Sequence, residues 1–196
     1  WFQGLREQKK HGRIALEYKF FAEYIPEKFS FICETPELWD IYINGEKLTA
    51  EENGRWIDEA FHKFDMTSAS LKNGENTIRL EADFYETLNI EAVYITGDFG
   101  VSLHNSDKTL VSPVRRILHG DIAKQGLPFY SGAISYKAKI DYNNEGRVFI
   151  SLPDFEAAVV KVSANGAAPK AIAWMPYEAD ITDMLKEGEN ELSIEY

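Results

Sequence analysis

The stretch that decides the fold is LKNGENTI at residues 71–78, because it recurs near the other end of the chain as LKEGENEL at residues 185–192. The two stretches are preceded by the same signals in the same order, namely an Asn-Gly pair, a tryptophan and an Asp-x-Thr triplet: Asn44-Gly45, Trp56 and Asp65-Met66-Thr67, then Asn165-Gly166, Trp174 and Asp180-Ile181-Thr182. A repeat distance of about 120 residues is too long for a solenoid. The sequence therefore predicts two copies of one domain.

Each signal has a local conformational meaning. Gly74 and Gly188 supply the left-handed residue that ends a short turn, after which a strand begins. Asp and Thr side chains accept hydrogen bonds from exposed backbone N–H groups at the start of such turns, so we expect Asp65 or Thr67 to cap the first turn and Asp180 or Thr182 to cap the second. Asn-Gly is a turn pair that tolerates positive φ. The repeated motif is thus strand, turn, loop, capped turn, strand.

The dominant period of the chain is two. Apolar residues alternate with polar ones in segments rich in β-branched and aromatic side chains, which is typical of half-buried strands. The apolar phases are Ile14/Leu16/Tyr18/Phe20, Trp39/Ile41/Ile43, Ile78/Leu80/Ala82, Ile90/Ala92/Tyr94, Ile134/Tyr136/Ala138/Ile140, Val148/Ile150 and Ala158/Val160/Val162. Because no long helical stripe accompanies them, the sequence predicts an all-β fold, with a first sandwich at residues 12–101, a linker at 102–125 and a second sandwich at 126–196.

The two copies differ in length. Residues 44 to 65 are 21 positions apart, whereas the matching residues 165 and 180 are 15 apart, so we expect a longer loop around Trp56. The second copy also ends at Tyr196, directly after the strand that matches 77–83. We therefore expect a truncated second sandwich whose edge, 191–196, is covered by the 102–125 linker, by a neighbouring molecule or by residues beyond Tyr196.

Composition narrows the class of function. Of the 196 residues, 44% are hydrophobic and 13% aromatic, which is enough to build cores, and the net charge is −11. An acidic chain lacks the basic face that nucleic acid and anionic membranes require, and it suits a neutral ligand such as a sugar, or a metal cation. The single cysteine, Cys33, lies in phase with Phe29 and Phe31, which indicates a buried small hydrophobe.

The combination of strand, Asn-Gly, aromatic loop, Asp-Ile-Thr and Leu-Lys-x-Gly-Glu-Asn resembles the galactose-binding-like jelly-roll β-sandwich of glycoside hydrolases. The resemblance is to the sugar-binding domain of glycoside hydrolase family 2 and to ancillary domains of α-L-rhamnosidase-like hydrolases, and it is carried by residues 174–182, 56–58, 65–67, 91–100 and 127–132. It implies two tandem sandwiches that brace the catalytic domain of the same parent chain. A likeness of fold does not by itself assign a function.

The sequence predicts no catalytic, metal or cofactor site. Glycoside cleavage needs two facing carboxylates, whereas adjacent candidates such as Asp58 and Glu59 point apart on an extended chain. The four histidines have no zinc spacing, and the chain has no Gly-x-Ser-x-Gly elbow. Asp58, Asp65 and Asp83 are the candidates for a structural calcium, but no Asp-x-Asp-x-Asp loop contains them.

Carbohydrate binding needs exposed aromatic faces beside polar side chains on rigid loops. Trp56 with Asn53, Arg55 and Asp58 is the main candidate, and the second copy offers Trp174 and Tyr177. The alternative is that both tryptophans cover the core of their own sandwich. We thus predict a non-catalytic, carbohydrate-associated region of a larger glycoside hydrolase, or alternatively an autonomous carbohydrate-binding module.

Overall fold

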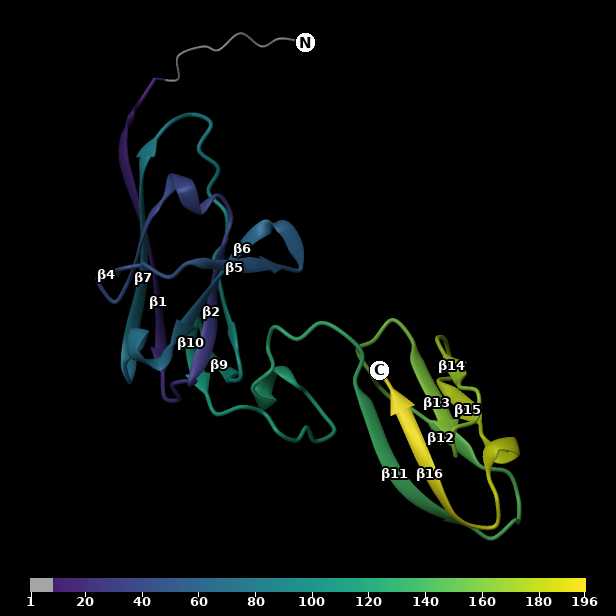
Figure 1. Cartoon of the computed structure of the whole chain (residues 1–196). Helices are drawn as coiled ribbons and strands as arrows, with labels where there is room; N and C mark the ends of the chain where they lie inside the picture. The colour runs from purple at the N-terminus through teal and green to yellow at the C-terminus, as the bar shows by residue number, and fades with distance from the viewer. Residues whose placement is uncertain (1–8) are drawn as a thin grey trace, which may run out of the picture. The chain divides into compact units, whose positions relative to one another are not determined.

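The computed structural model describes residues 9–196, and strands and turns account for nearly all of its regular structure (Figure 1). The all-β class predicted from the period of two is confirmed. The chain divides into two compact units, the first ending at Tyr130 and the second spanning Ser131–Tyr196. Among the described residues, no helix has the length and apolar character needed to cross a membrane.

The first unit is built from two sheets. Its strands are β1 (Gly12–Ala22), β2 (Lys28–Cys33), β3 (Asp40–Ile43), β4 (Glu46–Lys47), β5 (Glu52–Trp56), β6 (Asp58–Thr67), β7 (Gly74–Phe84), β8 (Tyr94–Gly97), β9 (Gly100–His104) and β10 (Asp107–Val111). One sheet has the strand order β4-β3-β7-β1-β10-β9 and the other has β5-β6-β2-β8. Short 3₁₀ turns, η1 (Pro36–Leu38) and η2 (Ser68–Ser70), precede β3 and β7.

The inner faces of these two sheets share one core. Alternate residues of β2 and β3 are buried against residues of β7, with Phe31 fully buried and Ile41 and Leu80 nearly so. Because successive side chains of a strand point to opposite faces, this alternation is the predicted period of two. Burying a side chain of the size of Phe31 stabilises the fold by about 2 kcal/mol relative to leaving it exposed.

The second unit repeats part of this arrangement with fewer strands. It contains β11 (Ser135–Tyr142), β12 (Phe149–Ser151), β13 (Val160–Ala164), β14 (Lys170–Ile172), β15 (Glu178–Asp180) and β16 (Gly188–Glu195), with the 3₁₀ turn η4 (Thr182–Met184) before β16. One sheet has the order β11-β16-β13-β14, and β12 pairs with β15. Val160, Val162 and Ile181 are fully buried in its core.

The strand pairings of the two units correspond. The order β14-β13-β16-β11 matches β4-β3-β7-β1, and the antiparallel pair β12–β15 matches β2–β6. The registers agree as well, since Gly188 opposes Tyr142 at the start of β16 as Gly74 opposes Ala22 at the start of β7. Within residues 131–196, however, β5, β8, β9 and β10 have no matching strand. The repeated sequence signals thus correspond to a repeated strand topology.

A pair of asparagines holds the repeated motif together in the first unit. Asn76 is fully buried, and its side chain donates to the carbonyls of Lys72 (2.7 Å) and Gly74 (3.0 Å) and accepts from the Lys72 N–H (2.9 Å). Asn44 donates to Asn76 Oδ1 (2.8 Å) and to the Ser70 carbonyl (3.0 Å). Its own Oδ1 accepts from the N–H of Thr77 at 3.1 Å. The pair therefore ties the β3–β4 turn to the start of β7.

The second unit has the same pair in the same geometry. Asn190 is 1% exposed and bonds both backbone groups of Lys186 at 2.8 Å and the carbonyl of Gly188 at 2.7 Å. Asn165 donates to Asn190 Oδ1 (2.7 Å), donates to the Met184 carbonyl (3.0 Å), and accepts from the Glu191 N–H (3.1 Å). The φ angles also repeat, at 51° for Asn44 and 52° for Asn165. Asn165 and Asn190 thus reproduce every bond of the first pair.

The predicted equivalence of the aspartates is inexact. Asp180 accepts from the N–H of Thr182 at 3.0 Å and caps the turn as expected, but Asp65 bonds Ser30 on β2 instead. Asp65 precedes its 3₁₀ turn by three residues and Asp180 by two. Asp65 is therefore one residue farther from its turn than Asp180 is, and its carboxylate bonds the neighbouring strand instead of the turn.

The tryptophans are not equivalent either. Trp56 ends β5, a strand that the described second unit lacks, whereas Trp174 follows β14.

The inward-facing residues of segment 90–95 also differ from the prediction. Val93 and Ile95 pack against the core, whereas we expected Ile90 and Tyr94 to do so. Pairing of Tyr94 with Ile32 on β2 sets this phase.

The stretch expected to be a linker belongs in part to the first sheet. Residues 102–111 form the end of β9 and all of β10, and the boundary between the units follows Tyr130. Beyond β10 the chain folds back, since the Val101 N–H donates to the Gly126 carbonyl at 2.8 Å. A Cβ on Gly126 would lie 2.8 Å from the Val114 side chain, so this approach requires glycine.

The expected unpaired edge lies elsewhere. We predicted it at 191–196, but β16 runs between β11 and β13 and pairs with both, so that expectation is wrong. The strand after Gly-Glu-Asn is central in both units, as β7 shows between β1 and β3. In the second unit, as described over residues 131–196, β11 and β14 are the outer strands of the larger sheet.

Replacing Asn76 with Ala should destabilise the first unit by about 3 kcal/mol, because it removes the fully buried side chain that bonds the part-buried backbone groups of Lys72 and Gly74. Asn73→Ala is the matched control, since Asn73 is exposed in the same turn. Urea denaturation followed by tryptophan fluorescence measures both. Equal stability of the two variants would show that the asparagine pair is not the structural link we describe.

Candidate functional site

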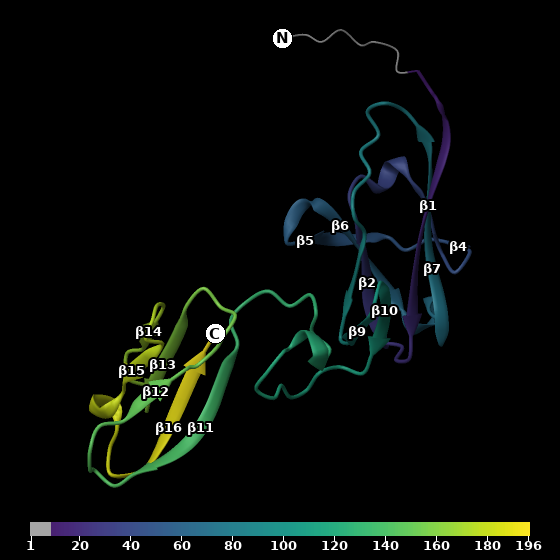
Figure 2. The same ribbon diagram turned by 180° about the vertical axis from the view of Figure 1, so that it is seen from behind.

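The longer loop of the first copy forms a β-hairpin. β5 and β6 pair with a bulge around Gly54 (φ 82°) and turn at Ile57 (φ 62°), whose side chain is 86% exposed. Figures 1 and 2 show this hairpin extending beyond the rest of the first unit's strands. The six additional residues predicted from the repeat thus add one strand, β5, to the edge of the β5-β6-β2-β8 sheet.

Three aromatic rings meet on the outer face of this sheet. Trp56 lies 5.4 Å from Tyr94 and 6.0 Å from Phe61, and Phe61 lies 5.6 Å from Tyr94 in an edge-to-face arrangement, each measured between ring centroids. The rings come from β5, β6 and β8, so the cluster spans the sheet. Tyr94 is 38% exposed, and Trp56 and Phe61 are partly exposed. Such contacts fix the rings relative to one another.

The rings cover an apolar residue on the outer face. Phe31 and Cys33 point into the core, so Ile32 between them points outward, and yet it is fully buried. Its neighbours in register are Lys63 on β6 and Tyr94 on β8. The side chains above these strands must therefore enclose Ile32, and the aromatic cluster rests on a packed base.

A polar cluster lies farther along the same face. Asp65 accepts from Ser30 Oγ at 2.9 Å and from the side-chain amide of Asn53, and Lys63 Nζ lies 3.1 Å from its carboxylate. The hydrogen bonds from Asn53, Ser30 and Lys63 lower the pKa of Asp65 from 3.8 to about 2. Its side chain remains 49% exposed. Asp65 is thus an ionised, positioned acceptor that faces solvent.

Two of the predicted residues lie away from this face. Arg55 pairs with Glu52 and donates to the Glu59 carbonyl at 2.9 Å, and Glu52 in turn bonds His62 at 2.7 Å. Arg55 opposes His62, which shares the inward phase of β6 with Phe64. Asp58 accepts from the Ala60 N–H at 2.9 Å within the hairpin turn. The structure therefore brings Trp56 and Asn53 to one face and places Arg55 and Asp58 in the framework of the hairpin.

The predicted pair in the second unit separates. Tyr177 packs edge-on against Phe155 with centroids 4.8 Å apart and joins the core, whereas Trp174 is 79% exposed. Neither Trp174 nor Trp56 belongs to a core cluster, so the alternative in which both cover their sandwich cores is wrong. Trp39 does pack against the core, as predicted.

Sequence reasoning missed most of the outer-face residues. Phe61, Lys63 and Asp65 share one phase of β6, and this alternation was visible in the sequence. Ser30 and Tyr94, however, join them only because β2 pairs with β6 on one side and with β8 on the other. Such pairing is non-local and leaves no sequence signal at those positions.

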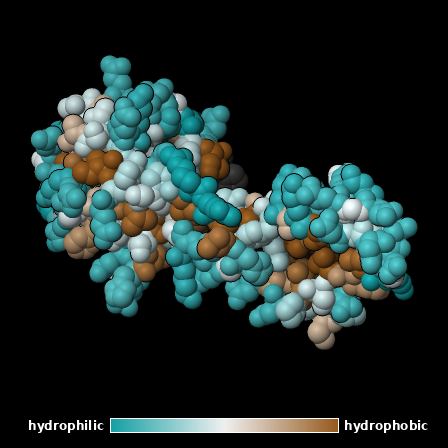
Figure 3. All heavy atoms as spheres, turned by 90° about the horizontal axis from the view of Figure 1, so that it is seen from below, coloured by the Kyte–Doolittle hydropathy of each residue, from teal (hydrophilic) through white to brown (hydrophobic). Residues whose placement is uncertain are grey.

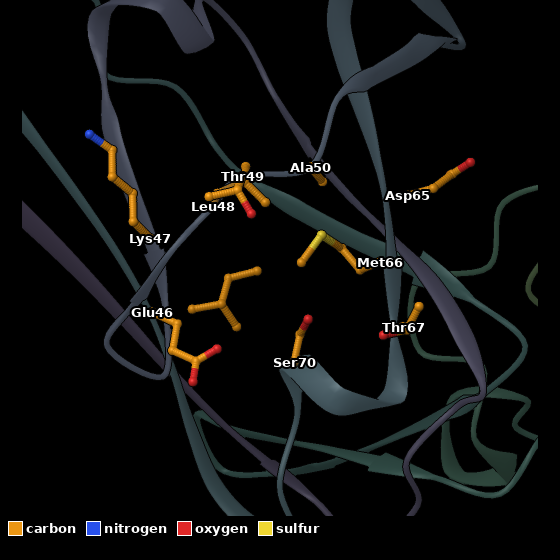
Figure 4. Close-up of a pocket in the computed structure, with 10 residues that line it drawn as sticks. Glu46, Lys47, Leu48, Thr49, Ala50, Asp65, Met66, Thr67 and Ser70 are labelled. Carbon is orange, nitrogen blue, oxygen red and sulfur yellow. The ribbon is translucent and has the colours of Figure 1, made fainter.

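A depression of about 230 Å³ opens between the edges of the two sheets of the first unit. Met66 and Ser70 point into it, while Asp65 and Lys47 point away, as Figure 4 shows. In the second unit Lys170, opposite Val162, occupies the place of Leu48, and its Nζ bonds the Asp180 carbonyl at 2.7 Å. The corresponding space of the second unit is therefore crossed by a lysine.

Another depression, of about 420 Å³, lies beside Trp39 and Tyr85. Its Arg13 pairs with Asp40 at 2.9 Å and with Glu81 at 3.1 Å. These ion pairs are exposed, so each contributes little to stability. They pair Arg13, Asp40 and Glu81 with one another on this surface.

The candidate calcium residues are dispersed among separate contacts. Asp58 bonds the hairpin turn, Asp65 lies in the polar cluster, and Asp83 pairs with Lys10 at 2.7 Å. Over residues 9–196, no group of three or more His, Cys, Asp or Glu side chains is arranged to hold a metal ion.

Cys33 is buried as predicted, and this burial raises its thiol pKa to about 12.

Apolar side chains also reach the surface outside this site. Figure 3 shows apolar patches between hydrophilic ones on the face it presents. Trp174 and Met175 are the most exposed large apolar residues that are adjacent in sequence, with exposed fractions of 79% and 77%.

No protein-family model matches the chain, and no curated protein matches it in sequence. What the outer face of the β5-β6-β2-β8 sheet can bind is therefore inferred from the arrangement of its side chains.

The depressed pKa of Asp65 predicts a pH dependence. A carboxylate with a folded-state pKa of about 2, below its usual 3.8, stabilises the fold above pH 4 and loses that contribution as the pH falls toward 2. The stability difference between the wild type and Asp65→Asn should therefore be constant near neutrality and shrink below pH 4. Urea denaturation at several pH values measures it, and a difference that stays constant down to pH 2 would contradict the assignment.

Proposed function

We propose that the chain is a non-catalytic, carbohydrate-associated region of a larger glycoside hydrolase, and that it contacts glycan through the outer face of the β5-β6-β2-β8 sheet. The observation that carries this proposal is the cluster of Trp56, Phe61 and Tyr94 on the same face as the positioned carboxylate of Asp65. Sugars present apolar C–H faces and a rim of hydroxyl groups. Aromatic rings match the faces, and a fixed acceptor matches the hydroxyls.

At the level of the fold, we propose that both units are galactose-binding-like jelly rolls. The supporting observation is the asparagine pair, which links the same two strand ends in both units through the same set of hydrogen bonds. Two-sheet packing around one core in each unit is consistent with this assignment.

Bracing of the parent enzyme's catalytic domain is the proposed role of the second unit. Within residues 131–196 this unit has no strand matching β5 or β8, so it cannot build the aromatic face of the first. It exposes Trp174 and Met175 instead. Adjacent exposed apolar side chains of this size favour packing against another protein surface.

An autonomous carbohydrate-binding module is the second candidate. The observation that favours it is that Trp56, Phe61, Tyr94 and Asp65 all belong to the first unit, so the face is complete without another chain. Both candidates share the glycan contact. The two candidates differ in the expected affinity for polysaccharide, because a free module should bind it by itself, whereas a bracing region should bind it weakly.

Affinity electrophoresis in gels containing soluble polysaccharides tests the glycan contact. Trp56→Ala should lower the affinity for the retarding polysaccharide about tenfold, since it removes an aromatic anchor of the face. Trp174→Ala, in the other unit, is the matched control and should migrate as the wild type does. Equal retardation of the wild type and Trp56→Ala, with the fold intact by circular dichroism, would remove the site.

The proposal also predicts that the purified chain does not hydrolyse aryl glycosides. On the outer face Asp65 is ionised and bonded to three partners, whereas glycosidases need an opposed acid and base. Release of nitrophenol from a panel of aryl glycosides measures this. Turnover that disappears on replacement of one carboxylate would contradict the non-catalytic assignment.

A further inference from the structure

We infer that the outer face of the β5-β6-β2-β8 sheet binds an uncharged oligosaccharide that lies along β6, and that a single sugar ring does not fill it. This inference rests on the proposed function and adds the size and charge of the ligand. It follows from where the aromatic and polar groups lie along one strand.

The two groups are separated along β6. Phe61 and Asp65 are four residues apart on β6, so the alternation of the strand points them to the same face. At about 3.3 Å of rise per residue, the aromatic and polar ends are about 13 Å apart. One pyranose ring that stacks on Phe61 or on Trp56, which opposes Asp58 at the far end of β6, cannot also reach the Asp65 carboxylate. A ligand that uses both ends must therefore contain several sugar units.

The surface between the two ends is continuous. Lys63 lies in the middle of this stretch of β6, and its side chain is 30% exposed beside the buried Ile32. The residues level with Lys63 are Ile32 on β2 and Tyr94 on β8, and those level with Asp65 are Ser30 and Thr96. The outward face thus passes from aromatic rings, over the buried Ile32, to the short side chains of Ser30 and Thr96 beside Asp65. An extended chain can follow this series of side chains along β6.

The charges at the polar end of the face favour a neutral ligand. Lys63 and Asp65 are paired at 3.1 Å, and so one positive and one negative charge offset each other. Glu52 lies in the inward phase and pairs with Arg55 and His62. A uronic acid at the polar end would meet the Asp65 carboxylate, and like charges at close range repel. Hydroxyl groups, in contrast, can donate to that carboxylate.

The hairpin makes the site specific to the first unit. Trp56 and Asn53 both come from β5, one at each end of the proposed path. In residues 131–196 the corresponding sheet consists of β12 and β15. We therefore expect one oligosaccharide per chain, although the fold is duplicated.

Isothermal titration of the full chain with neutral oligosaccharides of increasing length tests the inference. The probes are gluco-, xylo-, manno- and galacto-configured series of one to six units, with oligogalacturonides as the acidic comparison. Affinity should rise at least tenfold between the monosaccharide and the longer members of the series that binds, then level off, with a stoichiometry of one. The oligogalacturonides should bind more weakly than the neutral series.

Two variants separate the ends of the site. Trp56→Ala should weaken binding of short and long members alike, whereas Asn53→Ala should weaken only the members long enough to reach Asp65. Asn73→Ala, exposed in the turn before β7, is the control and should bind as the wild type does.

The outcomes distinguish the two proposals. Monosaccharide binding as tight as that of the longest member, with sensitivity to Trp56→Ala, would overturn the oligosaccharide inference and leave the proposed glycan contact standing. Loss of affinity for every chain length in Asn53→Ala would also overturn it. Absence of binding across all series by the folded protein would overturn both.

Discussion

The hydrogen-bonded asparagine pair is the constraint on which the rest of each unit depends. Asn44 with Asn76, and Asn165 with Asn190, satisfy backbone groups on two turns that would otherwise be buried without partners. Unpaired buried groups of this kind are costly, because they lose their bonds to water. The pair thereby fixes where the central strand, β7 or β16, begins beside its neighbour, and the register of the sheet follows from that position.

The asparagine pair is the same in both units, and the units differ at the edges of their sheets. The first unit adds β5 to one side of the β6-β2 pair and β8 to the other, and both additions contribute a ring to the outer face. The second unit, within its described residues, keeps the central strands and exposes Trp174. A duplicated fold with one elaborated copy is consistent with one copy that contacts ligand and one that supports it.

A structural feature could be predicted from the sequence when the residues that determine it are close together in the chain. The turns at Gly74 and Gly188, the capping role of Asp180 and the strand phases of Ile41 and Leu80 follow from short-range chemistry, and the sequence predicted them. Asp65 differs from Asp180 through a one-residue offset, which no turn signal reveals. The outer face needs the order β5-β6-β2-β8, and sheet order is set by packing between distant segments.

The most direct test of the account is to map a bound neutral hexasaccharide on the chain by NMR chemical-shift changes of backbone and side-chain amides. The account predicts shifts at the Trp56 indole, the Asn53 side-chain amide and the backbone of Tyr94, all from one binding event. The buried asparagines Asn76 and Asn190 should not shift. Shifts gathered around Trp174, or around the depression at Met66 and Ser70, would contradict the assignment of the glycan site to the outer face.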